Sequence, residues 1–175
     1  GPAAFTVPYG VMSPAQMYAM RTTRLFHDHN ISPDTLKAVS LAAYHHAQSN
    51  PRAVMNGRPL DAQTYDDARW ITEPFRLFDC CLENDGAAAV IVMSADRAKD
   101  VTDFPVYPLS VQQGGPHRSG ATVHNETDYA TSSFKSMVPH LYAQAGVGPE
   151  DVDVVQSYEN FTGAVVMSLI AEKML

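Results

Sequence analysis

The chain has 175 residues, 45% of them hydrophobic and 18% charged, which is enough to bury a sizeable core in one ordered unit. Its formal net charge is −7 and its basic residues are scattered, so the composition excludes a surface for binding nucleic acid. The longest apolar run, residues 87–93, is far shorter than the roughly 20 residues that cross a bilayer, and no signal-like segment opens the chain. We therefore expect a soluble cytoplasmic protein without a membrane span.

Two helices are predicted near the start of the chain. The segment Ser13-Pro14-Ala15-Gln16 combines an N-cap, a first-turn proline and a capping-box glutamine, and apolar residues follow it at helical spacing. The segment Ser32-Pro33-Asp34 repeats this start signal before a second apolar face, which ends at Pro51. The sequence therefore predicts helices over 14–29 and 33–49, joined as an αα-hairpin.

Three strands are predicted in the rest of the chain. Residues 87–93 form a continuous apolar run with β-branched members, which is typical of a strand buried on both faces. Residues 106–111 and 152–156 are further candidate strands. Between residues 112 and 127 the chain is rich in Gly, His, Ser and Thr, and a polar loop of this length is usually functional.

Two further helices complete the predicted order. One carries an apolar stripe from Phe134 to Ala145 and ends at Gly146, and the other covers residues 161–173. This alternation of helices and strands favours an α/β architecture, in which helices cover the faces of a sheet. Because the chain opens without a methionine and no strand follows the last helix, we expect it to be part of a larger protein.

Three segments match, in order, the signatures of one enzyme superfamily. Residues 79–90 read Asp-Cys-Cys-Leu-Glu-Asn-Asp-Gly-Ala-Ala-Ala-Val, and residues 17–53 contain a helical pair with a His-x-Ile-Ser-x-Asp link. Residues 145–155 begin with Ala-Gly and contain Asp-Val-Asp. The first segment is similar to the Asn-Ala-Ser-Gly-x-Asn-Asp-Gly-Ala-Ala-Ala signature of thiolases, the second to their helical lid, and the third to the opening of their second half. The chain thus resembles the thiolase superfamily.

The resemblance implies an α/β fold of the thiolase type, layered αβαβα with a helical lid, and incomplete at both ends of this chain. It assigns residues 1–78 to the lid and loop region, 79–120 to the end of the N-terminal thiolase half, and 121–175 to the start of the C-terminal half. It also implies a homodimer that pairs through its sheets. Members of the aldolase branch pair with small oligonucleotide-fold proteins of the DUF35 type, so such a partner is expected as well.

The segment Tyr158-Glu159-Asn160-Phe161 departs from the common thiolase pattern. Thiolases carry Asn-Glu-Ala-Phe here, and the sterol-carrier type has His in place of the Asn. Tyr-Glu-Asn-Phe resembles the lipid-transfer-protein aldolases of steroid side-chain breakdown, which implies that Tyr158 is a catalytic base or proton relay; the alternative is an ordinary packing tyrosine. Glu159 either supports the active site or pairs with a lid residue. Asn160 either caps the final helix or turns its amide to the active site.

Coenzyme A is expected as part of the substrate, with no permanently bound cofactor and no metal. Cys81 stands where thiolases have a Ser that lines the pantetheine channel, so the resemblance makes it a pocket wall. The lid basic residues Arg21, Arg24 and Arg52 are candidates to meet the adenine end. His117, on the glycine-rich loop, is a candidate phosphate contact, unless that loop is simply solvated.

Three functions follow from the resemblance. The first is an acyl-CoA-dependent carbon–carbon lyase, which performs retro-aldol cleavage of a β-hydroxyacyl-CoA such as a steroid side-chain thioester and releases a ketone and a short acyl-CoA, for example propionyl-CoA. The second is a thiolase or acetyl-CoA acyltransferase of the sterol-carrier type, which needs a nucleophilic Cys. The third is a non-catalytic thiolase-like subunit that binds acyl-CoA or lipid. The Tyr-Glu-Asn-Phe segment favours the lyase.

Overall fold

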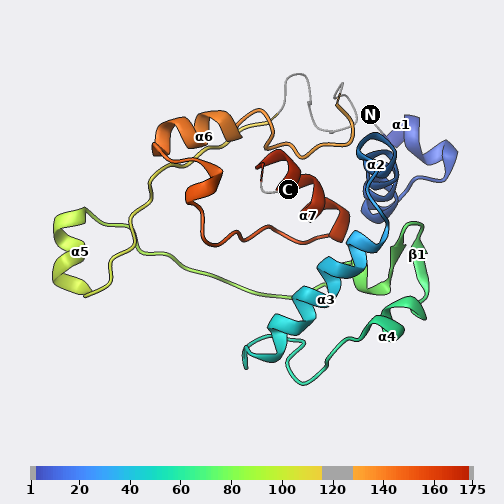
Figure 1. Cartoon of the computed structure of the whole chain (residues 1–175), viewed down its shortest axis with the longest axis horizontal. Helices are drawn as coiled ribbons and strands as arrows, with labels where there is room; N and C mark the ends of the chain where they lie inside the picture. Colours follow the sequence, from blue (N-terminus) through green and yellow to red (C-terminus); the bar gives the residue numbers. More distant parts are fainter. Residues whose placement is uncertain (1–2, 116–127, 174–175) are drawn as a thin grey trace.

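The structure, a computed structural model, describes residues 3–115 and 128–173 (Figure 1). In chain order its elements, with η for a single turn of 3₁₀ helix, are α1 (Ala3–Thr6), η1 (Val7–Tyr9), α2 (Pro14–His29), α3 (Asp34–Gln48), α4 (Ala62–Asp66), β1 (Trp70–Thr72), β2 (Phe75–Arg76), η2 (Leu77–Asp79), α5 (Ala95–Val101), α6 (Val138–Ala145), η4 (Pro149–Asp151) and α7 (Thr162–Ala171). None of the helices in the described ranges has the length and apolarity needed to cross a membrane.

The predicted helical pair is confirmed as α2 and α3. Ser13 Oγ accepts a hydrogen bond from the backbone N–H of Gln16 at 3.3 Å, and Gln16 Oε1 accepts one from the N–H of Ser13 at 3.0 Å. This reciprocal capping box satisfies two of the donors that a helix start leaves unpaired. Helix α2 ends at Asn30, whose left-handed backbone (φ 51°) lets the chain turn into α3.

The core lies where α7 packs against both α2 and α3 (Figure 1). Phe161, just before α7, stacks on Phe75 with ring centroids 5.4 Å apart and also contacts the ring of Tyr18 at 5.0 Å. Aromatic pairs at such distances stabilise a core by about 0.5–1.5 kcal/mol beyond their buried area. The start of α7 is thereby fixed against α2 and β2. The buried apolar cluster consists of Ala19, Leu25, Leu36, Phe75, Ala130, Phe161, Val166 and Met167.

Helix α7 approaches α2 most closely at Gly163. A Cβ atom at this position would lie 2.0 Å from Thr22 Oγ1 and 2.9 Å from Thr22 Cγ2, far inside van der Waals contact. Both residues are buried, and Thr22 is fully enclosed. The absence of a side chain at residue 163 is therefore what allows this helix packing.

The predicted strands over 87–93, 106–111 and 152–156 are wrong as descriptions of this structure. In the described part of the chain, β1 and β2 form a two-stranded antiparallel sheet, with Trp70 opposite Arg76 and Thr72 opposite Phe75. Residues 87–93 run as an extended, unpaired segment (Figure 1), and Val90, Ile91 and Val92 are 84–86% exposed. A strand requires a neighbouring strand to pair its backbone groups, and an apolar run specifies burial without supplying that neighbour.

The predicted C-terminal helices are confirmed with shorter bounds. Helix α6 starts at Val138 instead of near Phe134, because the chain forms turns before Pro139, which stands in the first helical turn. Its end at Gly146 is as predicted, with a left-handed φ of 71°. Helix α7 lies within the predicted 161–173.

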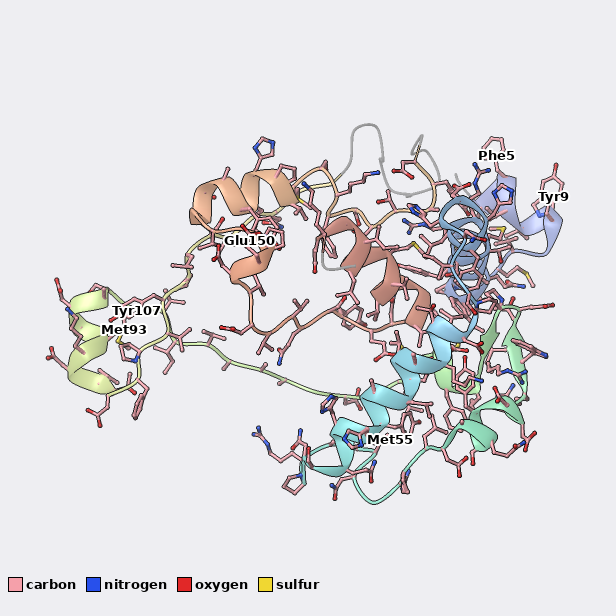
Figure 2. The ribbon with its side chains drawn as sticks, viewed as in Figure 1. Phe5, Tyr9, Met55, Met93, Tyr107 and Glu150 are labelled. Atoms are coloured by element: carbon pink, nitrogen blue, oxygen red, sulfur yellow. The ribbon has the colours of Figure 1, made fainter. Side chains whose placement is uncertain are left out.

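Helix α5 was not predicted, and it stands apart from the packed helices at the end of two extended arms (Figure 1). Figure 2 shows Met93 and Tyr107 together at its base, and it shows Phe5 and Tyr9 directed outward from the opposite side of the molecule. Phe5 and Tyr9 are 80% and 83% exposed. These peripheral parts take no part in the core described above.

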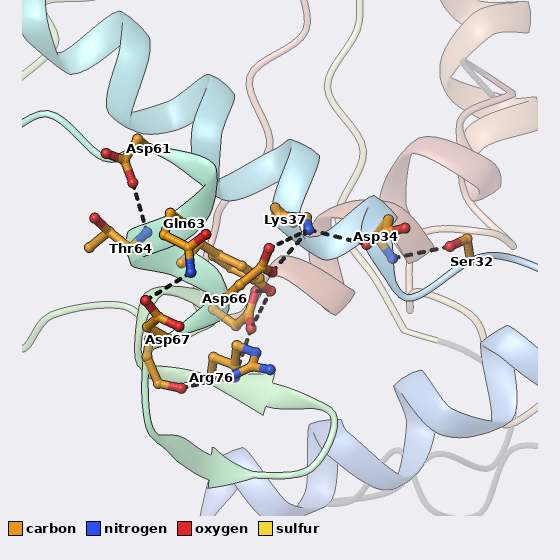
Figure 3. Close-up of polar contacts among 12 residues, drawn as sticks. Ser32, Asp34, Lys37, Asp61, Gln63, Thr64, Asp66, Asp67 and Arg76 are labelled. Carbon is orange, nitrogen blue, oxygen red and sulfur yellow. Dashed lines mark hydrogen bonds and ion pairs between the residues drawn. The ribbon is translucent and has the colours of Figure 1, made fainter.

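Helix α4 is held beside α3 by charged side chains (Figure 3). Lys37 Nζ lies 2.9 Å from Asp66 Oδ1 and 3.4 Å from Asp34 Oδ1, while Asp61 caps the start of α4 by accepting from the N–H of Thr64 at 2.7 Å. Exposed ion pairs of this kind contribute little to stability, because water and salt screen the charges. These contacts matter because they fix the position of α4, which carries the buried side chain of Tyr65.

Candidate functional site

Two of the motifs quoted from the sequence lie side by side in the structure. Cys80 and Phe161 form an antiparallel bridge, and the N–H of Cys81 donates to the carbonyl oxygen of Asn160 at 3.0 Å. The segment that leaves the lid is thus tied to the Tyr-Glu-Asn-Phe segment, although the two are far apart in the sequence. This short pairing sits directly before the first turn of α7.

The extended backbone sends the three predicted catalytic side chains to opposite sides, as expected for a period of two residues. Tyr158 and Asn160 line a hollow of about 90 Å³ together with Arg21 and residues of α7. Glu159 lines a different pocket. The structure therefore brings Tyr158 and Asn160 together and separates them from Glu159.

The pocket that contains Glu159, here called the lid pocket, has a volume of about 250 Å³. It lies between α3, the turn after it and the segment that leaves the lid, with Ser40, Tyr44, Met55, Phe78, Cys81 and Glu159 among its walls. Cys81 thus lies in a pocket wall, and its predicted place along the pantetheine arm stays a prediction. Burial raises the pKa of Cys80, next to it, to about 11, aided by the charge of Asp79, so this thiol stays protonated at neutral pH.

Burial raises the pKa of Glu159 above its ordinary value, and the negative charge of Asp79 adds to this effect. Glu159 in turn contributes to the raised pKa of Tyr44, for which burial is again the larger cause. The titratable groups around Glu159 are therefore Asp79, Tyr44 and the two cysteines. A carboxyl group in this position takes up a proton at a higher pH than an exposed one.

This shift predicts a pH-dependent gain in stability for Glu159→Gln. Because the folded-state pKa is above the unfolded-state value, stability falls as pH rises from the unfolded pKa through the folded pKa. The variant lacks this loss, so its melting temperature relative to wild type should rise as the pH increases from the unfolded-state pKa of this carboxyl group through its raised folded-state pKa. Glu83→Gln, at an exposed carboxylate, is the matched control and should show no such rise. Parallel changes in both variants would contradict the assignment.

Asp79 is a buried polar centre that the sequence did not single out. It is 1% exposed, and its carboxylate accepts from Tyr65 Oη at 2.8 and 2.9 Å and from the N–H of Arg76 at 2.7 Å. Thr162 Oγ1, in the first turn of α7, donates to it at 2.9 Å, and Ser40 Oγ lies 3.4 Å away. The pKa of Tyr65 is raised by burial and by this carboxylate. The signal in the sequence that could have indicated this buried carboxylate is the position of an acidic residue between Phe78 and two cysteines.

The structure separates the basic residues predicted to meet coenzyme A. Arg21 is 3% exposed and donates through Nε to the carbonyl oxygen of Tyr129 at 3.0 Å and through Nη2 to that of Thr131, so it holds residues 129–131 against α2. Arg24 is exposed and pairs with Asp28, with Nε 2.7 Å from Oδ2. Arg52 is exposed in the turn after α3, which leads away from α2 (Figure 1). His117 lies outside the described residues.

Other features lie away from the Tyr158–Asn160 region. A cavity of about 600 Å³ lies between α6 and α7, and none of residues 158–160 lines it. Besides apolar residues, its walls include the titratable side chains of His29, Asp128, Lys135, Tyr142, Glu150 and Lys173. Across residues 3–115 and 128–173, no three or more His, Cys, Asp or Glu side chains gather at distances suited to a metal ion. The chemistry-bearing groups around the start of α7 include the Tyr158 phenol, the Asn160 amide, the carboxyl groups of Asp79 and Glu159, and the thiols of Cys80 and Cys81.

Comparison with known proteins tests the thiolase-like motifs of the chain. The chain is 33% identical over 172 residues to the steroid side-chain-cleaving aldolase of Thermomonospora curvata, a match that covers 95% of this chain and 43% of the relative. It is 34% identical over 168 residues to the 17-hydroxy-3-oxo-4-pregnene-20-carboxyl-CoA lyase of Mycobacterium tuberculosis, covering 95% and 44%. No protein-family model matches the chain.

A solved structure gives the same result at the level of the fold. The structure described as "Ltp2-ChsH2(DUF35) aldolase" superposes with a TM-score of 0.85 at 30% identity, covering 99% of this chain and 46% of that one. The predicted resemblance is therefore confirmed: the chain is thiolase-like and is homologous to part of the steroid side-chain aldolases. It spans less than half the length of each of these relatives.

Proposed function

We propose that the protein is an acyl-CoA-dependent carbon–carbon lyase that performs retro-aldol cleavage of a β-hydroxyacyl-CoA, with a steroid side-chain thioester as the substrate. The relatives named aldolase and CoA lyase support the reaction class. The observation that carries the proposal is Tyr158, which is 81% exposed at the end of an extended segment beside α7. A tyrosine with so little packing is available for chemistry, and thiolases have an Asn or His at this place.

In the proposed reaction, Tyr158 takes or relays the proton of the substrate's β-hydroxyl group. The oxygen then forms a carbonyl with Cβ as the Cα–Cβ bond breaks, and the bonding electrons pass to the enolate of the shorter thioester. Protonation of that enolate at Cα releases the short acyl-CoA, such as propionyl-CoA, beside a ketone. Asn160, on the same hollow as Tyr158, is proposed to support the developing negative charge with its amide.

Coenzyme A is proposed to enter as part of this substrate. Cys81 and the lid pocket are proposed to hold its pantetheine arm, with Glu159 at the pocket wall. Of the basic residues, Arg52 is exposed next to residues 53–55 of the lid pocket and is proposed to meet the nucleotide end. Arg24 is paired with Asp28 on α2, and Arg21 holds residues 129–131 in place. The phosphate contact predicted for His117 stays a prediction.

The whole-protein arrangement is proposed from the same relatives. Residues 1–78 act as the lid region, 79–120 as the end of the first thiolase half and 121–175 as the start of the second. The layered αβαβα arrangement is proposed for the whole protein. A homodimer and a small DUF35-type partner are proposed as well, the latter supported by the name of the solved structure.

The experiment that tests this proposal separates a lyase from a thiolase by its need for free coenzyme A. The full-length protein, with its DUF35-type partner present, is incubated with a tertiary β-hydroxyacyl-CoA of the steroid side-chain type, and products are followed by mass spectrometry. A lyase forms the ketone and the short acyl-CoA without added coenzyme A. A thiolase instead cleaves a β-ketoacyl-CoA and requires free coenzyme A, so cleavage of only the β-keto substrate would contradict the proposal.

A further inference from the structure

The buried carboxylate of Asp79 joins four separate parts of the chain at one point. Its partners are Tyr65 on α4, the backbone N–H of Arg76 on β2, Ser40 on α3 and Thr162 on α7. All of these donors are neutral, and hydrogen bonds to a charged acceptor are shorter and about twice as strong as those between neutral groups. A carboxylate held by this many donors has a fixed orientation, and so do the groups that donate to it.

The contact with Thr162 is the one that reaches the candidate catalytic segment. Asp79, Cys80 and Cys81 run antiparallel to residues 160–162, and three successive interactions join them. These are the Thr162 hydroxyl to Asp79 at 2.9 Å, the bridge between Cys80 and Phe161, and the Cys81 N–H to the Asn160 carbonyl oxygen at 3.0 Å. Tyr158 lies two residues beyond the last of these, so its position depends on this pairing.

We propose that Asp79 is a positioning residue for the lyase reaction: through the Thr162 hydroxyl it fixes the first turn of α7 and, with it, Tyr158 and Asn160. This inference rests on the proposed function, because the group that Asp79 is proposed to position is Tyr158, the catalytic group of that function. A displacement of about 1 Å at a reacting group can lower the rate roughly 100-fold. Asp79 itself lies behind the segment and does not line the hollow of Tyr158.

Thr162→Val and Tyr65→Phe form a matched pair for testing this role. Each removes one hydroxyl donor from the same carboxylate with little change in side-chain shape, but only Thr162 links Asp79 to α7. In the full-length protein, Thr162→Val is expected to lower kcat on the order of tenfold to 100-fold with KM within about threefold of wild type. Tyr65→Phe should keep kcat per folded molecule within about threefold of wild type, even if its melting temperature falls as much as that of Thr162→Val.

Conservative rescue separates the hydroxyl from the rest of the side chain. Thr162→Ser restores the donor and should return kcat to within about threefold of wild type. Should Thr162→Val fail to fold, Asp79→Asn takes its place against the same Tyr65→Phe control, since it keeps the shape of the carboxylate. Equal losses of kcat per folded molecule in Tyr65→Phe and in the Thr162 or Asp79 variant would overturn the proposal, because they would mark a purely structural role.

A second readout needs no turnover and so separates this inference from the proposed function. The Cys81 amide hydrogen is bonded to Asn160, and its exchange with solvent reports whether the pairing is intact. Thr162→Val should speed that exchange on the order of tenfold relative to wild type, and Tyr65→Phe should not. If the wild type cleaves no β-hydroxyacyl-CoA, the proposed function fails. The exchange experiment alone then decides whether Asp79 positions residues 158–160 through Thr162. Unchanged Cys81 exchange in Thr162→Val would overturn the positioning role.

Discussion

Tyr158→Phe is expected to lower kcat by about 10²–10⁴-fold, the range that general acid–base catalysis contributes. The substitution keeps the ring and removes only the hydroxyl group. KM should stay near the wild-type value, because the lost interaction acts mainly in the transition state. Folding should also be preserved, since the side chain is 81% exposed. Steady-state release of the ketone and the short acyl-CoA, measured with the full-length protein, gives both constants.

Tyr9→Phe provides the matched control for this experiment. Tyr9 is 83% exposed, belongs to η1 at the periphery of the molecule (Figure 2), and lines a different pocket from the Tyr158 hollow. Its phenylalanine variant loses an equivalent hydroxyl group and should leave kcat unchanged. If Tyr158→Phe instead retains activity within about threefold of wild type, which is below the smallest factor expected of an acid–base group, Tyr158 is not the proton-transfer residue.

Gly163→Ala is the second substitution with a large expected effect, this time on stability. The new Cβ atom would lie 2.0 Å from Thr22 Oγ1, so α2 and α7 must separate. Overpacking of a close-packed core costs typically about 1–3 kcal/mol, and this contact belongs at the upper end. A loss of about 3 kcal/mol corresponds to a melting temperature lower by roughly 6–12 °C for a domain of this size. Thermal unfolding followed by circular dichroism measures it.

Thr22→Ala should rescue this variant. It removes the two closest atoms and leaves the Thr22 Cβ at 3.0 Å from the new side chain. Among the described residues, Thr22 Oγ1 has no hydrogen-bond partner, so its removal alone should cost little. The double variant should then be clearly more stable than Gly163→Ala alone. Additive losses would show that the helix packing does not depend on this contact.

Helices α2, α3, α6 and α7 could be predicted from the sequence because their signals are local. The Ser13–Gln16 capping box and the left-handed glycine at Gly146 act within a few residues of themselves, and both appear in the structure as expected. The strand over 87–93 failed for the opposite reason. Its apolar residues indicate a buried environment, but a strand is completed by another segment, and in the described residues none pairs with it.

The candidate site shows the same division between local and distant information. The position of Tyr158 directly before a helix followed from its motif, and the wall position of Cys81 agrees with the structure. Asp79 was missed because its partners Ser40, Tyr65 and Thr162 come from three distant parts of the chain. Arg21 looked like a free cation in the sequence, yet its contacts with the backbone of residues 129 and 131 depend entirely on the tertiary fold.

The most direct measurement for the central claim is product analysis of wild-type cleavage in deuterated water, with the full-length protein, the proposed DUF35-type partner and no free coenzyme A. Retro-aldol cleavage forms the enolate of the short thioester, which must take a proton from the medium at Cα. The account predicts one ketone for each short acyl-CoA, with a single deuterium on Cα of the latter. Absence of the ketone, or formation of short acyl-CoA only when free coenzyme A is added, would contradict it.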